Sequence, residues 1–234
     1  MEQDPNAKKR VLRKAVEHIP KSVRLWKEVV NIETDPAEAR IILARAVQVI
    51  PSSVELWLAL ARLEDPKNAR AVINKARKEI PTSHEIWIAA GRLIEQEAMA
   101  PEKSQQERDK EFRAIDKTIE HGVKSLRQNQ VLLTREQWMK EAERCEEEGG
   151  VRTCEAIIKA TAEMEVEEED WYDTWVADAD SALARGKIVT ARAILAYALG
   201  KFPDRKALWR TAADLERAHG TKYVPVSQGS NSAY

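Results

Sequence analysis

Apolar residues recur along this chain at intervals of three and four positions, the spacing that places side chains on one face of an α-helix. In several segments a leucine or isoleucine is followed three positions later by alanine. These pairs are Leu12 and Ala15, Leu43 and Ala46, Ile73 and Ala76, and Leu195 and Ala198. The chain contains no run of alternating β-branched residues, so the pattern predicts an all-α protein.

Tryptophan marks a second set of helices, which follow the first set. Proline is followed six residues later by tryptophan at Pro20 and Trp26, Pro51 and Trp57, Pro81 and Trp87, and Pro203 and Trp209. The proline ends one helix because it lacks an N–H group, and the tryptophan lies in the first turns of the next helix. The first three tryptophans lie 31 and 30 residues apart. A fixed period of this length is typical of a stacked array of helical units.

Capping residues mark the predicted helix starts. Three Asp-Pro pairs fall in register, and in each the carboxylate accepts from free N–H groups while proline needs no donor. They are Asp4-Pro5, Asp35-Pro36 and Asp65-Pro66. Three other helices are expected to begin with a capping box. The residue pairs with that spacing are Ser52 and Glu55, Thr82 and Glu85, and Thr134 and Gln137.

Two weaker copies of the pattern fill the remaining stretches. A helix over Lys117–Leu126 precedes Trp138, and Gly122 takes the alanine position. A helix over Thr153–Ala162 precedes Trp175. The complete pattern predicts about twelve helices in a right-handed α-solenoid of antiparallel helix pairs, with five full pairs and a half unit at each end.

The periodicity also sets the expected domain organisation. We expect residues 1–221 to form a single solenoid. Residues 222–234, which are low in charge and rich in Ser, Gly and Asn, are expected to form a disordered tail. The open ends of such an array expose apolar surface, so self-association through them is also expected.

Six tryptophans hold equivalent positions in the repeat and are expected in its core. They are Trp26, Trp57, Trp87, Trp138, Trp175 and Trp209. Trp171 lies out of register beside Tyr172, after an acidic run. Both an exposed aromatic anchor and a local packing role are open for it.

The spacing of the repeats fails twice, and insertions in solenoids often mark a partner site. The interval from Trp87 to Trp138 is 51 residues, and its surplus, Glu97–Asp109, predicts a lengthened helix, a loop and a long helix. The interval from Trp138 to Trp175 is 37 residues and carries an acidic insertion.

Charge is uneven although the net charge is only −1. Residues 141–180 carry 3 basic and 15 acidic side chains, residues 81–140 are balanced at ten each, and the two ends of the chain, 1–80 and 181–234, are basic. This distribution argues against a continuous nucleic-acid track, because phosphates would be repelled at the centre. The acidic band is either a solvated helix face or a docking site for a basic partner segment. The candidate partner-binding residues are Glu163, Glu165, Glu167, Glu168, Glu169, Asp170 and Trp171.

A basic cluster near the start of the chain is also a candidate for weak RNA contact or nuclear import, or is a solvated helix face. It comprises Lys8, Lys9, Arg10, Arg13 and Lys14.

Candidate reaction chemistry is lacking in the sequence. The four histidines are scattered, and no nucleophile, phosphate-loop or zinc-protease motif occurs. Cys145 and Cys154 lie nine residues apart without a nearby histidine, so we interpret both as ordinary thiols in a reducing compartment. No apolar stretch approaches the roughly 18 residues of a membrane span. We therefore expect no catalytic residues, cofactor, metal, membrane contact or small-molecule substrate.

Several details resemble the half-a-TPR (HAT) repeat of RNA-processing proteins. Tryptophan is followed seven residues later by glutamate, and an Ala-Arg pair opens the helix that proline closes. The glutamates are Glu33, Glu64 and Glu216, and the pairs are Ala39-Arg40, Ala69-Arg70 and Ala191-Arg192. The tetratricopeptide pattern fits less well, because its Gly occurs once and its Tyr is missing.

A narrower resemblance is to the pre-mRNA-processing factor 6 family, HAT-repeat splicing factors of the spliceosomal tri-snRNP. Asn68–Pro81 (NARAVINKARKEIP), Glu167–Asp170 before Thr174-Trp175, and Ala191–Leu199 (ARAILAYAL) carry it. The resemblance implies a nuclear, non-enzymatic scaffold that bridges small nuclear ribonucleoproteins through contacts with other spliceosomal proteins. The chain looks like a central repeat segment of that family.

Three alternatives remain open from the sequence. The first is a HAT-repeat scaffold of another RNA-processing complex, such as messenger 3′-end cleavage. The second is a TPR-like adaptor that holds peptide tails in a groove lined by basic and Asn side chains. The third is a direct RNA-binding module.

Overall fold

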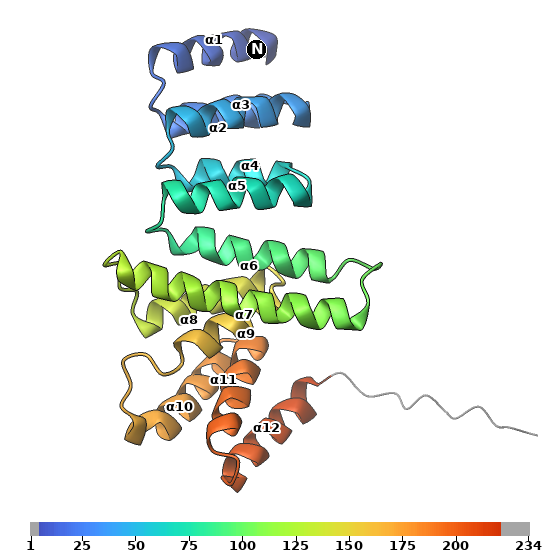
Figure 1. Ribbon diagram of the computed structural model, residues 1–234, viewed down its shortest axis with the longest axis vertical. Helices are drawn as coiled ribbons and strands as arrows, with labels where there is room; N and C mark the ends of the chain where they lie inside the picture. Colours follow the sequence, from blue (N-terminus) through green and yellow to red (C-terminus); the bar gives the residue numbers. More distant parts are fainter. Residues whose placement is uncertain (1–4, 221–234) are drawn as a thin grey trace, which may run out of the picture. The chain divides into compact units, whose positions relative to one another are not determined.

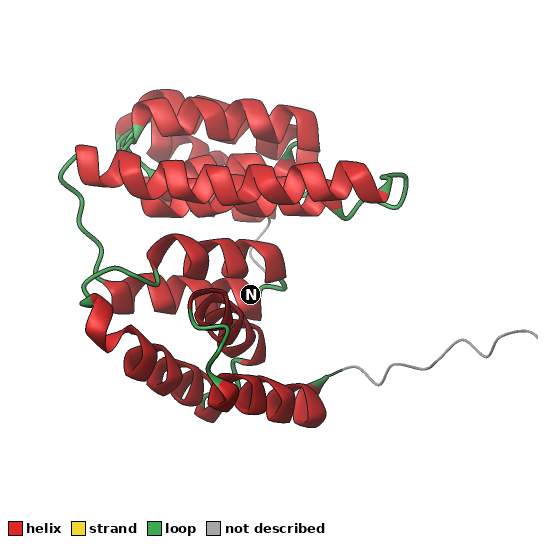
Figure 2. Ribbon diagram, turned by 60° about the horizontal axis from the view of Figure 1, so that its bottom comes forward, coloured by secondary structure: helices red, strands yellow, loops and turns green. Residues whose placement is uncertain are grey.

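The computed structural model describes residues 5–220 (Figure 1). Over that range the chain forms twelve α-helices and one 3₁₀ turn. They are α1 (Pro5–His18), α2 (Val23–Ile32), α3 (Pro36–Val49), α4 (Val54–Leu63), α5 (Pro66–Glu79), α6 (His84–Ala98), α7 (Gln105–Gln128), α8 (Arg135–Glu147), α9 (Val151–Thr161), η1 (Glu168–Asp170), α10 (Trp171–Ala184), α11 (Ile188–Lys201) and α12 (Lys206–His219). Figure 2 shows loops and no strand between these helices. The all-helical prediction with about twelve helices is confirmed, and the arrangement is consistent with an α-solenoid.

The chain divides into two compact units, Met1–Thr161 and Ala162–Tyr234. In the first unit, helices α1 to α6 each pack against the next helix in the chain, and α7 and α8 both pack against α9. The core of its first repeats is built from Leu43, Leu56, Trp57 and Ile86, all almost fully buried. In the second unit, α11 packs against both α10 and α12. The expected tail, residues 222–234, lies outside the described residues.

Two Asp-Pro pairs begin helices as predicted. The Asp35 carboxylate accepts a hydrogen bond from Ala37 N at 2.9 Å, and the Asp65 carboxylate accepts one from Asn68 N at 3.0 Å. Pro36 and Pro66 are the first residues of α3 and α5. Asp4, the third predicted cap, lies outside the described residues.

Two of the predicted capping boxes are wrong by one residue. The caps of α4 and α6 are Ser53 and Ser83, in place of Ser52 and Thr82. The preceding turn is the reason, because Ser53 N donates to Ile50 O at 3.2 Å and keeps Ser52 inside the turn. The third predicted box, Thr134 with Gln137, forms at the start of α8. A further box, Ser104 with Glu107, begins α7 and was not predicted.

The proline–tryptophan spacing has a direct structural explanation. The indole Nε1 of Trp26 donates to Pro20 O at 2.8 Å, and Trp57 makes the same bond to Pro51 O at 2.8 Å. The indole therefore satisfies a carbonyl that the end of the preceding helix leaves free. Each such bond contributes about 0.5–1.5 kcal/mol to stability.

Trp87 packs against the longer helix α7. Its ring lies edge-on to His121 of α7, with centroids 5.4 Å apart. A Cβ atom on Gly122 would lie 2.8 Å from the Trp87 ring, so only glycine allows this approach. Its indole nitrogen is buried and has no hydrogen-bond partner among the described residues. The lengthened α6, the loop and the 24-residue α7 agree with the prediction for Glu97–Asp109.

Five of the six repeat tryptophans are buried, and Trp209 is the exception. Trp26, Trp57, Trp87, Trp138 and Trp175 are at most 5% exposed, whereas Trp209 is 55% exposed. Trp209 keeps the bond to Pro203 O at 2.8 Å. It lies on α12, the last described helix, which packs against α11. The expectation of a core position is therefore corrected for this residue.

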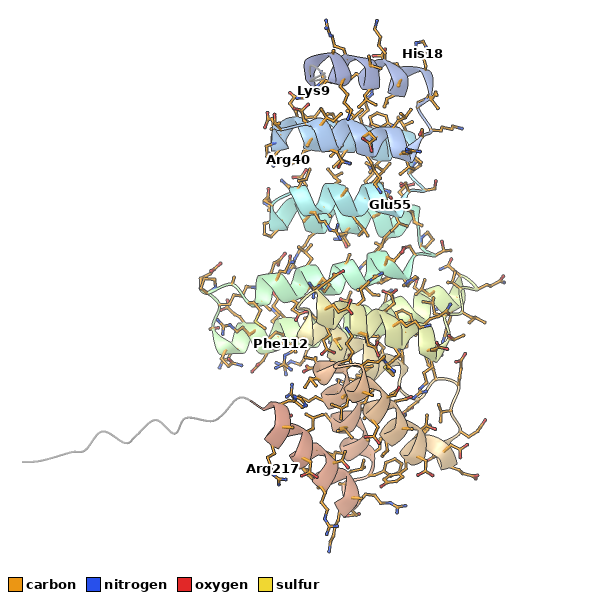
Figure 3. All side chains as sticks on the ribbon, turned by 180° about the vertical axis from the view of Figure 1, so that it is seen from behind. Lys9, His18, Arg40, Glu55, Phe112 and Arg217 are labelled. Atoms are coloured by element: carbon orange, nitrogen blue, oxygen red, sulfur yellow. The ribbon has the colours of Figure 1, made fainter. Side chains whose placement is uncertain are left out.

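Ion pairs join two columns of charged residues that the sequence repeats. Lys9 of α1 (labelled in Figure 3) donates to Glu33 after α2 at 2.9 Å. Arg192 of α11 pairs in the same way with Glu216 of α12 at 2.5 Å. The hydrogen bond from the cation lowers the pKa of each of these two glutamates. Each pair links the first turns of one helix to the end of the following helix.

None of the helices between residues 5 and 220 has both the length and the apolar character that a membrane crossing requires.

Candidate protein-interaction surface

The acidic insertion Glu163–Asp170 lies in the second unit, directly before α10. Its last three residues, Glu168–Asp170, form the single turn η1. The side chains of Glu167, Glu168, Glu169 and Asp170 are exposed, and in the described part of the chain they have no hydrogen-bond or ion-pair partner. These four residues are the acidic rim. They place four carboxylates on consecutive positions, where a cationic partner can reach them.

Glu163, at the start of the insertion, is engaged inside the unit. Its carboxylate accepts from Lys201 Nζ at 2.5 Å and from Tyr197 Oη at 2.7 Å, both on α11. The bond from Lys201, followed by that from Tyr197, lowers the pKa of Glu163. Burial and the bond to Glu163 raise the pKa of Tyr197. Glu163 therefore anchors the insertion, and its role as a partner-binding residue is not supported by its contacts.

Trp171 packs locally at the other end of the insertion. Its ring stacks on Trp175 with centroids 5.3 Å apart and 17° between the planes. Its Nε1 donates to Val166 O at 3.1 Å, and Lys201 Nζ lies 5.1 Å from the ring centroid. The half-buried indole thus closes the insertion onto α10, in agreement with the packing interpretation rather than with a free anchor.

Trp175 is the centre of the aromatic cluster beneath the insertion. Its Nε1 donates to Ala162 O at 2.9 Å. Tyr197 lies edge-on to it at 5.2 Å, and Phe202 lies 5.9 Å away. Aromatic pairs of this kind contribute about 0.5–1.5 kcal/mol each beyond their burial. The cluster holds the acidic rim in a defined place on the surface.

The residues of α11 that hold the insertion were not found from the sequence. Tyr197 precedes the alanine position of its repeat, and His121 and Lys75 occupy the same place in theirs. Each lies against the tryptophan of the preceding helix, at 5.2 Å for Tyr197, 5.4 Å for His121 and 5.8 Å for Lys75. The position directly before the alanine of each repeat was therefore the sequence signal that could have identified Tyr197. Lys201 has no such signal, because its contact with Glu163 depends on the insertion.

The basic cluster on α1 contains both ion-paired and exposed side chains. Lys9 and Arg13 both contact the carboxylate of Glu33. Lys8, Arg10 and Lys14 are exposed, and within the described range no partner contacts their side chains.

The two cysteines are buried and not joined in a disulfide. Burial raises the pKa of the Cys145 thiol to about 12. The thiolate is the nucleophilic form, so this side chain is chemically inert near neutral pH.

Comparison with protein-family models gives no match. Among curated proteins, Pre-mRNA-processing factor 6 of Homo sapiens is 49% identical over 99 residues, which cover 42% of this chain and 10% of the human protein. Pre-mRNA-splicing factor prp1 of Schizosaccharomyces pombe is 46% identical over 107 residues, covering 46% of this chain and 12% of that protein. Protein STABILIZED1 of Arabidopsis thaliana is 52% identical over 56 residues, covering 24% and 5%.

The matched part of the chain thus spans about a tenth of the length of the first two relatives. Two of the three proteins are named as factors of pre-mRNA processing or splicing. The resemblance to the pre-mRNA-processing factor 6 family is confirmed, with this chain covering a segment of it.

Proposed function

We propose that this chain acts in pre-mRNA splicing, as a non-enzymatic segment of a protein scaffold in the nucleus. The observation that carries the proposal is the identity of 46–49% to Pre-mRNA-processing factor 6 and prp1. Following the expectation from the family, the segment contributes to bridging small nuclear ribonucleoproteins in tri-snRNP assembly. It does so through contacts with other spliceosomal proteins.

The proposed scaffold is a single HAT-repeat solenoid over residues 1–221, right-handed and built from antiparallel helix pairs. The ion pairs support the antiparallel arrangement. Lys9 lies early in α1 while Glu33 follows α2, and Arg192 lies early in α11 while Glu216 lies near the end of α12. A contact between the start of one helix and the end of the next is what antiparallel neighbours make.

The acidic rim is the proposed contact for a basic segment of another spliceosomal protein. Its four carboxylates have no partner among residues 5–220, whereas Glu163 at the start of the insertion is held by Lys201 and Tyr197. A cluster of carboxylates that is held in place attracts a basic segment, and the resulting contacts weaken as the salt concentration rises.

Affinity purification from nuclear extract tests the proposal. The tagged chain is expected to enrich tri-snRNP proteins, and this enrichment should survive RNase treatment. If subunits of the messenger 3′-end cleavage machinery are recovered in their place, the splicing assignment is wrong. Loss of the recovered proteins after RNase would make RNA the principal partner.

A pair of matched variants tests the acidic rim. Glu167→Lys, Glu168→Lys and Glu169→Lys together should reduce the recovered tri-snRNP proteins severalfold. The control reverses three other exposed carboxylates, Glu17, Glu79 and Asp180, and should leave recovery unchanged. Equal recovery with both triple variants would remove the rim from the interface while leaving the splicing role intact.

A further inference from the structure

A groove runs along one exposed face of α6 in the first unit. Two cavities, of about 350 Å³ and about 500 Å³, share Leu93 and Gln96 in their linings. The first cavity extends toward Glu85 at the start of α6 and the second toward Ala100 beyond its end. The 15 residues of α6 span about 22 Å at 1.5 Å per residue. An extended peptide of about seven residues has the same length.

The groove has an apolar floor. Ile88, Ala89 and Leu93 of α6 line it, and Leu58 of α4 and Ile73 of α5 line its side. Figure 1 shows α4, α5 and α6 following one another in this part of the first unit. Ile73 and Ile88 are almost fully buried, while Leu58, Ala89 and Leu93 are half-buried. The half-buried side chains offer apolar area that an occupant can remove from water.

Cations surround this floor. Arg62, Arg92 and Arg144 line the first cavity, and Lys67, Arg70 and Lys103 line the second. Three of them are ion-paired within the unit, Arg144 with Glu141, Arg70 with Glu97 and Lys103 with Glu111. The Arg62 side chain is exposed, and no interaction partner occurs for it between residues 5 and 220. Beside the first cavity, Arg62 and Arg92 are therefore the cations that no carboxylate pairs with in the described range, and they are the ones available to a partner.

Arg92 is held by backbone carbonyl groups, and in the described part of the chain no carboxylate pairs with its charge. Its guanidinium donates to Cys145 O at 3.2 Å and to Glu148 O at 2.7 Å, at the end of α8. One turn further along α6, the Glu95 carboxylate accepts from Arg152 N at 2.8 Å at the start of α9. The groove is thus preorganised, which reduces the cost of ordering its residues on binding.

We propose that this groove binds a peptide segment of another protein whose apolar side chains are flanked by Asp or Glu. The apolar floor fits leucine-sized side chains, and the arginines fit the flanking carboxylates. A phosphodiester backbone would pair with the arginines but leave the floor exposed, so the lining favours peptide over RNA. The lining also bears on the TPR-like adaptor alternative, since basic side chains do converge in it, although it contains no Asn. The proposal does not depend on the role in splicing.

A selection with a phage-displayed library of short random peptides tests the specificity directly. The enriched peptides should carry Leu, Ile or Phe next to Asp or Glu. The dissociation constant of the most enriched peptide, labelled with fluorescein, is then measured by anisotropy. Arg62→Glu and Leu93→Glu should each weaken its binding at least about tenfold. Arg45→Glu, the same charge reversal at an exposed arginine of α3 outside the groove, should change it less than twofold.

Circular dichroism verifies that the variants are folded. If Leu93→Glu does not fold, Arg62→Glu alone decides the test, because Arg62 is exposed and its replacement should not disturb the fold. Enrichment of basic peptides, or no enrichment above a selection against the Arg62→Glu chain, would overturn the proposal. It would also be overturned if polyuridylate displaced the peptide and itself lost affinity in Arg62→Glu. Light scattering that shows a multimer dissolved by Leu93→Glu would identify a second copy as the occupant.

Discussion

The carboxylate of Glu95 on α6 takes the place of an N-terminal cap for α9, and removing it should destabilise the first unit. One oxygen accepts from Arg152 N at 2.8 Å. The other accepts from Thr153 N at 3.1 Å and from Thr153 Oγ1 at 2.7 Å. Glu95 is only 5% exposed, so its removal takes a buried acceptor away from these donors. The perturbation we develop is Glu95→Ala.

The magnitude follows from these contacts. Loss of a helix cap costs about 0.5–2 kcal/mol, and a hydrogen bond to a charged group contributes about 1.5–3 kcal/mol. The contacts share one carboxylate and do not add, and desolvation of that carboxylate offsets part of their strength. We therefore expect Glu95→Ala to lower the free energy of unfolding of the first unit by about 2–4 kcal/mol. A chain of this size loses about 2–4 °C of melting temperature per kcal/mol.

Hydrogen exchange detected by mass spectrometry measures the effect locally, which matters because two compact units need not unfold together. Peptides that cover α9 should exchange much faster in Glu95→Ala than in the wild type, and those from α11 should not change. Glu95→Gln, which keeps an acceptor oxygen, should lose less stability. Gln96→Ala, an exposed neighbour on the same helix, is the control. Protection of α9 in Glu95→Ala equal to that of the wild type would refute the capping role.

Three further predictions concern other sites. The pKa of Glu163 is lowered in the folded chain, so its ionised carboxylate stabilises the second unit at pH values above its usual pKa near 4.5. This contribution is lost as the pH falls through the lowered pKa. An acid titration followed by tryptophan fluorescence should therefore show a shallower loss of structure in Glu163→Gln. Cys145, with its pKa raised to about 12, should react with a thiol reagent at neutral pH only after unfolding in urea; fast reaction of the native chain would contradict its burial. Trp57→Ala should cost about 3–5 kcal/mol and Trp209→Ala clearly less in urea denaturation, because the first ring is 2% exposed and the second 55%.

Features that depend on neighbouring residues in the chain could be predicted from the sequence. The Asp35 and Asp65 caps and the bond from Trp57 to Pro51 join residues that lie within six positions of each other. These residues recur because in each repeat a helix must be capped at its start and a carbonyl at the end of the preceding helix must be satisfied. The capping boxes at Ser52 and Thr82 failed by one residue, because a turn held by Ile50 or Ile80 precedes each cap and the spacing alone does not show it.

Contacts between distant residues could not be predicted in the same way. The Ala-Arg pairs and the recurring glutamates were visible in the sequence, but the pairing of Arg192 with Glu216 required the helices to be placed. The exposure of Trp209 depends on which helix covers it, and the repeat pattern contains no information on that. At the candidate surface, the sequence identified the acidic residues and Trp171 but not Lys201, whose ammonium holds Glu163 and lies over the Trp171 ring.

The distribution of satisfied and unsatisfied charge separates the residues that build the array from those available to partners. Lys9 with Glu33 and Arg192 with Glu216 are compensated inside their own units, so their charges contribute little to recognition. The acidic rim and Arg62 have no such compensation in the described residues. An exposed charge without a partner costs little in water, and it steers a partner of the opposite sign toward the surface and disfavours one of the same sign. The acidic rim is a run of four carboxylates, whereas the groove combines its arginines with an apolar floor. The first surface should therefore bind a basic segment with strong salt dependence, and the second an acidic-apolar segment with weak salt dependence.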